Sequence, residues 1–223
     1  MPLYQSTYHS RIFRDFKEID AANHRRIIRF YEDKEEDIQR LDFEEYFQLI
    51  VAYVNALFEV GAYQKHLLMV DVVIEMTIVH NVERYKGEDI YEKMLFRKAA
   101  SLYNIMEYAK AEYILRELIK IDPHSEYAIL FLRKCLRKKE PGFLNTAKAG
   151  SIFLFLLSAF VISIEVLFIR PFYKAHVEEV EFTRTAIFLL GCFVLVAGLL
   201  LHRWLVQRRV DSFVEKTRSA KID

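Results

Sequence analysis

Apolar residues follow two different patterns along this chain. Up to about residue 140 they recur at spacings of three, four and seven among charged residues, and beyond it they form two long runs, Ala149 to Ile169 and Thr185 to about Val206. The first pattern predicts amphipathic helices with one buried face. The second predicts helices that cross a bilayer, whose hydrocarbon core takes roughly 20 predominantly apolar residues. Because only a short polar stretch beginning at Arg170 separates the runs, we expect a hairpin of two transmembrane helices.

Residues typical of helix ends divide the amphipathic part into predicted elements. Residues 1–12 show no periodicity and predict a flexible arm, whereas residues 13–40 carry a narrow apolar stripe typical of one or two helices. Asp42 with Glu45 three residues later has the pattern of a capping box, which begins a helix that Gly61 ends. Further helices are predicted over 63–80, 90–105, 109–121 and 124–139, with a linker over 81–89. Few glycines and prolines and almost no alternating pattern make the predicted fold class all-α.

One stretch of this helical part has a more specific pattern. In residues 95–123 a helix with the small residue Ala99 in mid-face is followed by a turn, by Tyr108, by a second small residue, Ala111, and by a closing Pro123. Small residues let two helices approach within about 8–10 Å of each other. This stretch resembles a repeat of the tetratricopeptide-repeat family.

An earlier stretch resembles the same repeat less closely. Residues 47–80 have the turn at Gly61, but His66 stands where a small residue is usual, and about 45 residues separate the two turns. Residues 126–139 resemble the first helix of a third repeat.

The resemblance implies a stack of antiparallel helical hairpins whose concave face holds a peptide or a partner helix. The first helix of each hairpin would line this groove. The partner-binding residues that the resemblance implies are Asn55, Phe58, Lys93, Phe96, Tyr103, Asn104 and Tyr127. The alternative is that half of the groove side chains pack against the N-terminal helices.

Three residues in the predicted spans are candidates for a further role. An ionisable group costs roughly 2.5–3.5 kcal/mol at the centre of a span, but Glu165 lies near the predicted outer headgroups, where the cost is smaller. An interfacial, structurally neutral place is therefore favoured for Glu165 over pairing with another subunit or ion conduction. Gly191 and Gly198 lie seven residues apart near one face, and they allow close packing on Ser151, Ser158 or a helix of another protein.

Flanking charge predicts the orientation of the hairpin. Basic residues are more frequent before the first span and after the second than in the loop between them, and the N-terminus has no secretory signal. The positive-inside rule then puts both termini in the cytoplasm. We expect a multi-pass integral membrane protein, and low cysteine use without a targeting signal fits a bacterial inner membrane.

The predicted organisation has four parts. They are an N-terminal arm and amphipathic helix (1–41), a tetratricopeptide-like helical-repeat domain (42–140), a transmembrane hairpin (141–209, with spans over about 149–169 and 185–206) and a basic cytoplasmic tail (210–223).

Charge and motif content exclude several classes of function. Residues 1–140 hold 22 Lys and Arg against 24 Asp and Glu, a net charge of 22 − 24 = −2, which is no footprint for nucleic acid. The seven histidines are scattered, and no phosphate-binding loop, nucleophile elbow or metal-ligand spacing occurs. We therefore expect neither an enzyme nor a bound metal or cofactor.

The predicted function is that of a non-enzymatic, membrane-anchored scaffold whose cytoplasmic helical domain binds a protein or peptide partner. The alternative is an accessory subunit of a larger membrane complex, such as a transporter, translocase or secretion machine, with the hairpin as its main interface. The expected partners are thus the lipid bilayer and proteins, in the cytoplasm or within the membrane, and no nucleic acid.

Overall fold

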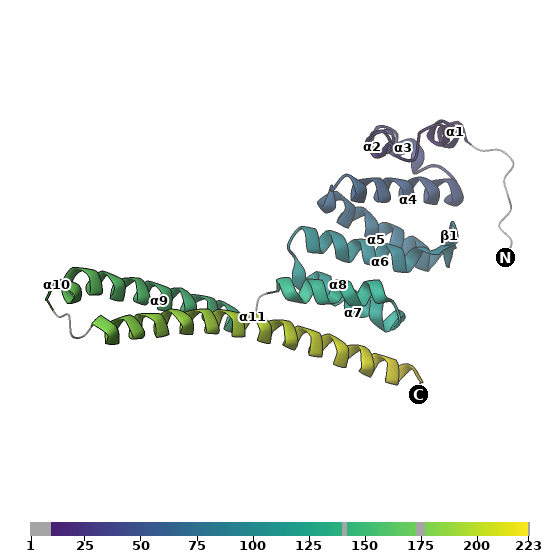
Figure 1. Ribbon diagram of the computed structural model, residues 1–223. Coiled ribbons are helices and arrows are strands. Elements are labelled where there is room, and N and C mark those ends of the chain that lie inside the picture. Colours follow the sequence, from purple (N-terminus) through teal and green to yellow (C-terminus); the bar gives the residue numbers. More distant parts are fainter. Residues whose placement is uncertain (1–9, 140–141, 173–176, 223) are drawn as a thin grey trace. The chain divides into compact units, whose positions relative to one another are not determined.

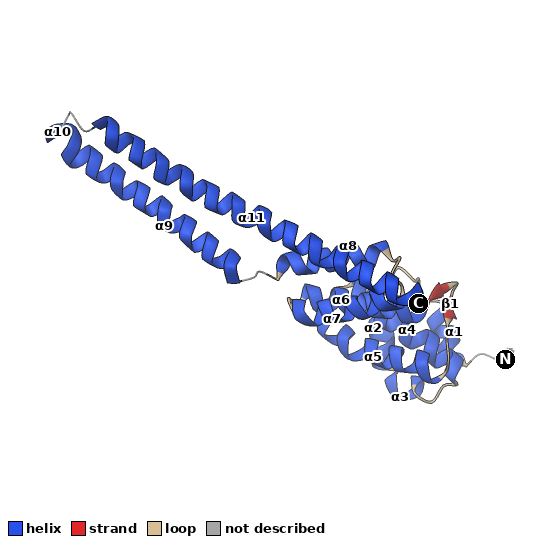
Figure 2. Ribbon diagram, turned by 90° about the horizontal axis from the view of Figure 1, so that it is seen from below, coloured by secondary structure: helices blue, strands red, loops and turns tan. Residues whose placement is uncertain are grey.

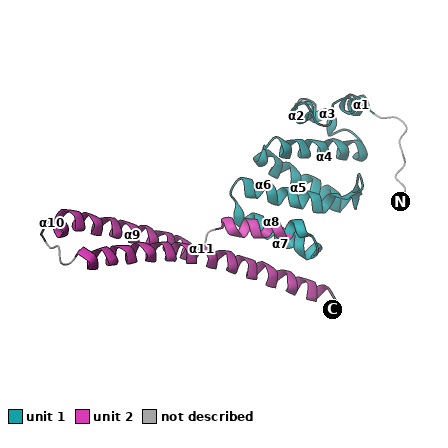
Figure 3. Ribbon diagram, in the orientation of Figure 1, with its two compact units in different colours: residues 1–128 teal, residues 129–223 magenta. Residues whose placement is uncertain are grey.

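The computed structural model describes residues 10–139, 142–172 and 177–222, and this part of the chain is almost entirely helical. The predicted all-α class is therefore confirmed. The residues group into two compact units, 1–128 and 129–223, which divide inside helix α8 (Glu126–Lys138) (Figure 3). Most of the predicted N-terminal arm lies outside the described residues.

Three short helices open the first unit. They are α1 (Arg11–Lys17), α2 (His24–Asp33) and α3 (Glu35–Ile38). Ser10 and Asn23 begin the first two, because each side chain accepts a hydrogen bond from a backbone N–H three residues further on. The predicted apolar stripe is buried at Ile27, Tyr31 and Ile38. The structure thus divides the expected one or two helices into three, and the first of them begins within the predicted arm.

Longer helices follow, and the first four of them pack on one another in sequence order (Figures 1 and 2). They are α4 (Phe43–Glu59), α5 (Tyr63–Val79), α6 (Ile90–Asn104) and α7 (Tyr108–Ile121), before α8 begins at Glu126. Asp42 caps α4 by accepting a hydrogen bond from the backbone N–H of Glu45 at 2.9 Å, as predicted. The Glu45 side chain in turn accepts the backbone N–H of Ser10 at 2.9 Å, which joins the start of α1 to α4.

Three helix ends share one turn geometry. After α4 the backbone N–H of Ala62 bonds the carbonyl of Leu57 at 2.9 Å, and after α6 that of Glu107 bonds Leu102 at 2.9 Å. This hydrogen bond across five residues is the Schellman motif, which needs a left-handed residue just before the donor. Gly61 fills that position with φ +79°, whereas Met106 fills it with φ +65°. The end of α5 is built in the same way around Asn81, with φ 50°.

The predicted linker over 81–89 contains a small β-hairpin. Strands β1 (Arg84–Tyr85) and β2 (Glu88–Asp89) pair antiparallel. Lys86 and Gly87 between them both have positive φ, as a two-residue hairpin turn requires. Strands of two residues are too short for an alternating pattern, so the sequence carries no signal for them beyond the turn.

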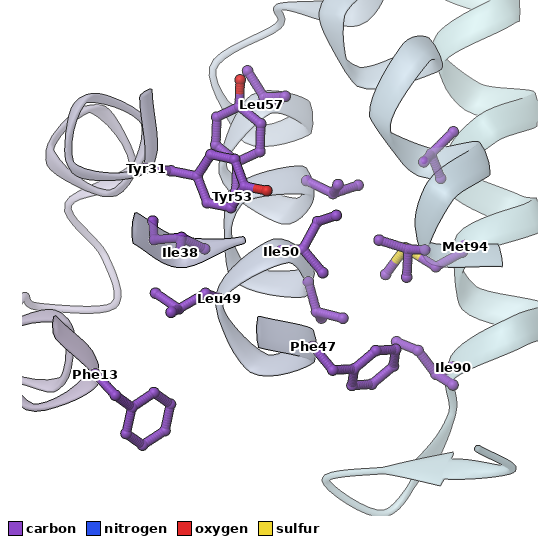
Figure 4. Packing of buried hydrophobic residues seen from close by; sticks show 14 residues of the cluster. Phe13, Tyr31, Ile38, Phe47, Leu49, Ile50, Tyr53, Leu57, Ile90 and Met94 are labelled. Carbon is purple, nitrogen blue, oxygen red and sulfur yellow. The ribbon is translucent and has the colours of Figure 1, made fainter. Parts of the chain in front are cut away.

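Helix α4 is the centre of the core of the first unit. Its buried apolar residues are Phe47, Leu49, Ile50, Val51, Tyr53, Val54, Ala56 and Leu57. In Figure 4 this helix lies between Phe13, Tyr31 and Ile38 on one side and Ile90 and Met94 on the other. Full burial of one such large apolar side chain contributes about 1.5–3 kcal/mol. The core therefore joins the N-terminal helices to α5 and α6 through α4.

The second unit contains the hairpin, in which α9 packs against the first part of the longer α11 (Figure 1). Its elements are α9 (Gly142–Ile164), the π-helix η1 (Glu165–Ile169), α10 (Arg170–Phe172) and α11 (Val177–Ile222). Two segments, Gly142–Ile169 and Val177–Lys221, are long and apolar enough to cross a membrane. Helix α9 begins seven residues before the predicted first span, and α11 continues without a break through the predicted tail.

Candidate functional site

Three of the predicted partner-binding residues line one pocket in the first unit. Lys93 and Phe96 lie three residues apart on α6 and so face the same side of that helix, and Tyr127 is the second residue of α8. With Leu118 of α7 they line a pocket of about 360 Å³. The Tyr127 side chain is 80% exposed. A large, nearly free aromatic side chain beside an apolar hollow is typical of a binding surface.

The rim of this pocket is mainly acidic. Glu88, Asp89 and Glu92 line it beside a single ammonium group, that of Lys93. Lys93 forms an ion pair with Glu88, and this contact lowers the pKa of the Glu88 carboxyl. Asp89 caps α6 by accepting the backbone N–H of Glu92 at 2.9 Å. The pocket therefore offers an apolar floor to one side chain and a net negative rim to its neighbours.

The acidic rim residues and Leu118 are missing from the residues predicted from the sequence. The signal for Asp89 was present, since an aspartate three residues before a glutamate is typical of a helix start. Glu88 belongs to the β-hairpin that the sequence did not reveal. Its place at the pocket follows from that hairpin.

Asn55 and Phe58 lie elsewhere in the first unit. Asn55 lines a different pocket, next to α1 and α2, and its Oδ1 atom has no hydrogen-bond partner among the described residues. The Phe58 ring packs under the guanidinium of Arg97, at 4.8 Å, and against the rings of Tyr63 and His66. Phe58 thus contributes to the packing of α4 on α5 and α6.

Tyr103 and Asn104 also lie apart from the pocket of Lys93. The Tyr103 ring meets the ring of Tyr108 edge-on across the turn between α6 and α7, with centroids 5.3 Å apart. Asn104 is the last residue of α6 and is exposed. The structure therefore distributes the predicted groove residues over separate parts of the first unit.

A buried histidine joins α5 to α6. His66 is fully buried, and its Nδ1 atom lies 2.9 Å from the hydroxyl of Ser101. Its Nε2 atom has no hydrogen-bond partner in the part of the chain that the structure describes. Burial, with a smaller contribution from the charge of Arg97, lowers the pKa of His66 to about 4. His66 is therefore a neutral packing residue, in the position where the resemblance implies a small one.

Small residues form the contact between α9 and α11. On α9, Ser151 and Ser158 are buried seven residues apart. On α11, a Cβ atom added at Gly198 would lie 3.0 Å from the Cβ of Ala147, and one added at Gly191 would lie 2.8 Å from the Phe155 ring. Both glycines therefore pack within the hairpin, where they let the helices approach closely.

Glu165 is fully buried in the second unit and paired with two arginines. One carboxylate oxygen accepts N–H groups of Arg170 at 2.8 and 3.1 Å, and the other accepts an N–H of Arg184 at 2.9 Å. Arg184 belongs to α11, so this cluster connects the two apolar helices. Glu165 therefore has its charge partners within its own chain.

The π-helix explains how Arg170 reaches Glu165. In a regular α-helix, residues five apart point about 140° away from each other. In η1 the backbone N–H of Arg170 bonds the carbonyl of Glu165, which is the wider π turn. Their side chains can then lie on one side of the helix.

The described residues hold few other candidates for chemistry. Among them, no group of three or more His, Cys, Asp or Glu side chains is arranged to bind a metal ion. Neither Cys135, which is buried, nor Cys192, which is half-buried, forms a disulfide. No family model, curated protein or solved structure matches the chain, so its similarity to tetratricopeptide repeats stays a prediction from the sequence.

Proposed function

We propose that this protein is a non-enzymatic, membrane-anchored adaptor whose helical domain binds a protein or peptide partner. The observation that supports it best is Tyr127, which is 80% exposed beside a pocket of about 360 Å³ lined by Phe96 and Leu118. Tyrosine is enriched among the residues that carry binding energy at interfaces. In this proposal an apolar side chain of the partner enters the pocket, and polar groups contact the rim.

The hairpin supports the membrane part of the proposal. Large apolar side chains project from it, with Phe153 64% exposed, Phe160 62% and Phe193 70%. So much exposed apolar surface is unfavourable in water and fits the hydrocarbon core of a bilayer. The charge distribution supports a topology with both termini in the cytoplasm, and a bacterial inner membrane is the proposed location.

Site-specific photo-crosslinking in the native membrane tests the adaptor function. A photoreactive amino acid replaces Tyr127 in the full-length chain, and a second version carries it at Tyr113, an exposed tyrosine of α7 outside the pocket. We expect a discrete protein adduct from position 127, none from position 113, and loss of the adduct when Phe96→Ala is added. An adduct that survives Phe96→Ala contradicts binding through this pocket.

The same experiment addresses the alternative, in which the hairpin is the main interface of an accessory subunit. The exposed aromatic side chains of α9 and α11 support it, because they would serve a protein neighbour as well as lipid. A third version therefore carries the photoreactive group at Phe160. A protein adduct from position 160 without one from position 127 would replace the adaptor with the accessory subunit.

A further inference from the structure

A second pocket in the first unit has the features of a ligand site. Its volume is about 290 Å³, and its walls come from α1, α2, α4 and the β-hairpin. Four separate segments thus surround one small space. Pockets for small organic molecules begin at about this size. This pocket shares no lining residue with the pocket of Lys93 and Tyr127.

Part of the wall of the second pocket is apolar, and the rest consists of polar side chains, among them a histidine and two amides. Ile27 and Val51 are buried core residues, and Phe16 and Tyr85 contribute half-buried rings. Such walls favour an aromatic or branched aliphatic group, because each contact removes apolar surface from water.

The charged side chains at this pocket are cationic. Lys17 and Lys86 line it, and none of its lining residues is acidic. The Lys17 ammonium group donates to the amide oxygen of Gln48 at 3.0 Å, and the Lys86 ammonium lies 5.4 Å from the centre of the Tyr85 ring. In the described part of the chain, neither lysine forms an ion pair with a carboxylate. Two positive groups beside an apolar hollow are a suitable place for an anion.

The charge of Lys86 disfavours the charge of Lys17. Burial and the nearby charge of Lys86 lower the pKa of Lys17. An anion bound between them would reverse this effect, since an opposite charge favours the ammonium form. Lys86 also occupies a turn position with φ 53°, which asparagine or glycine usually takes, so the lysine stands there at some conformational cost.

We propose that this pocket binds a small carboxylic acid with an apolar body, the body against Phe16, Ile27 and Val51 and the carboxylate next to Lys17 and Lys86. The acid is a free molecule or the last residue of a peptide, which present the same chemistry. The inference does not depend on the proposed partner site, because the two pockets use different residues.

Methyl NMR on the full-length chain in detergent micelles tests the proposal, with isoleucine methyl groups labelled. Ile19 and Ile27 line the pocket, and Ile119, a buried residue of α7, serves as the internal reference. The probes are 3-phenylpropionate, its uncharged amide, and an acetylated tripeptide ending in phenylalanine with a free carboxylate. We expect 3-phenylpropionate to shift the signals of Ile19 and Ile27 only, with Kd in the millimolar range, as suits a ligand of this size.

Charge dependence is the deciding result. The amide is expected to bind at least about fivefold more weakly than the acid. The Lys17→Met and Lys86→Met variants are each expected to bind 3-phenylpropionate about fivefold more weakly than the unaltered protein does. Lys65→Met, which removes a lysine on α5 outside the pocket, is the matched control and should leave binding unchanged. The amide comparison uses the unaltered protein, so the test holds even where a lysine variant folds poorly.

Two results would overturn the proposal. The first is equal binding of acid and amide, which would mean that no anion is recognised. The second is an absence of shifts at Ile19 and Ile27 with all probes up to their solubility limit. Tighter binding of the tripeptide than of 3-phenylpropionate would identify the natural ligand as a peptide end, and the reverse order would identify it as a free acid.

Discussion

At the scale of single residues, two side chains occupy positions where another residue type is usual. The side chain of His66, on α5, is buried against α6, although ionisation of a buried imidazole is costly. Met106 lies in the left-handed conformation that glycine adopts without strain. Each position makes the stability of the first unit depend on one identifiable property, protonation for His66 and backbone strain for Met106.

His66 should make the helical domain less stable in mild acid. Its pKa is about 4 in the folded chain against 6.5 for a free histidine, so between these values the unfolded chain binds the proton and the folded chain does not. The contribution of neutral His66 to the free energy of unfolding is therefore fully present above pH 6.5. It decreases by up to about 3 kcal/mol as the pH falls to 4.

Hydrogen exchange of the α5 and α6 amides at pH 7, 5.5 and 4.5, corrected for the intrinsic exchange rates, measures this loss in the full-length chain. His66→Gln keeps a polar side chain of similar size but does not titrate. The variant should show a smaller decrease over the same pH range. An identical decrease in both proteins would mean that His66 does not control it.

Met106→Gly should stabilise the protein. The Met106 side chain is 75% exposed, so its removal costs little burial, while glycine relieves the strain of φ +65°. The gain should be about 0.5–1 kcal/mol, seen as a rise of about 2 °C in the midpoint of thermal unfolding followed by circular dichroism. Met106→Ala retains the Cβ atom and is the control, for which no rise is expected. Equal midpoints for the two variants would exclude backbone strain as the cause.

At the scale of elements, the hairpin depends on close contact of α9 with α11 and on the charge cluster of Glu165. Along the contact, glycine and serine bring the two backbones together. At the cluster, Glu165 of η1 is paired with Arg184 of α11. Packing and charge pairing therefore fix the same register of the two helices.

Gly198→Ala should destabilise the hairpin. The added Cβ would lie 3.0 Å from the Cβ of Ala147, an atom that no side-chain rotation can move away, so the helices must separate. The expected loss is about 1–2 kcal/mol, measured by unfolding in lipid bicelles. Gly191→Ala should cost less, because its nearest neighbour is the Phe155 ring, which can turn, and the Cβ atom of Leu154 lies further away, at 3.3 Å.

Gly150→Ala is the matched control on α9, since its added Cβ meets nothing within 4 Å. This substitution should be neutral or slightly stabilising. A loss at position 150 as large as that at position 198 would show that helix contact is not the cause.

Glu165→Gln should weaken the cluster that connects η1 to α11. The change keeps the shape of the side chain but leaves Arg184 with only its longer contact, to the exposed Glu181 at 3.4 Å. Because the Arg170 side chain is 56% exposed, the expected loss of hairpin stability is of the order of 2 kcal/mol, which is below the loss for a fully buried ion pair.

A double-mutant cycle with Arg184→Gln separates pairing from other effects. If the ion pair is responsible, the double variant loses less stability than the sum of the two single variants. Strict additivity would contradict the pairing. A carboxylate that conducts ions would instead be revealed by a lost ion flux in Glu165→Gln with unchanged stability.

At the scale of the whole molecule, the chain combines a unit of charged, amphipathic helices with a unit whose two long helices each contain an extended segment with exposed apolar side chains. Only the apolar segments of the second unit are expected to lie in the hydrocarbon core of a bilayer. The number of crossings and the charge of the flanks then decide which side the remaining residues occupy.

Cysteine labelling tests the proposed topology. In a chain with Cys135→Ser and Cys192→Ser, single cysteines replace Glu179, near the start of α11, and Ser219, near its end; both positions are exposed. A membrane-impermeant maleimide added to sealed cells should label position 179, and it should label position 219 only after permeabilisation. Labelling in the opposite order would reverse the assigned orientation.

Local signals predicted much of the fold, and long-range contacts set the rest. Asp42, Gly61 and Pro123 mark helix ends in the sequence because caps and turns depend on neighbouring residues. Glu165 was placed at the interface without its partner, because Arg184 is 19 residues away and reaches it only through the register of α9 and α11. Asn55 and Tyr127 were expected in one groove. The packing of α1 and α2 on α4 gives Asn55 a pocket of its own, and periodicity alone does not predict such packing.

The unbroken course of α11 has a mechanical consequence. Sharp bends in helices occur at proline, glycine or π turns, and residues 199–222 contain neither of the two residue types. Beyond the predicted span, residues 207–222 form a stiff arm of roughly 24 Å at 1.5 Å per residue. If the span tilted by about 10° in a membrane of different thickness, the tip of this arm would be displaced by roughly 4 Å. Arg133 of α8, which donates to Asp211 on the arm at 2.6 Å, would be carried along by the same movement.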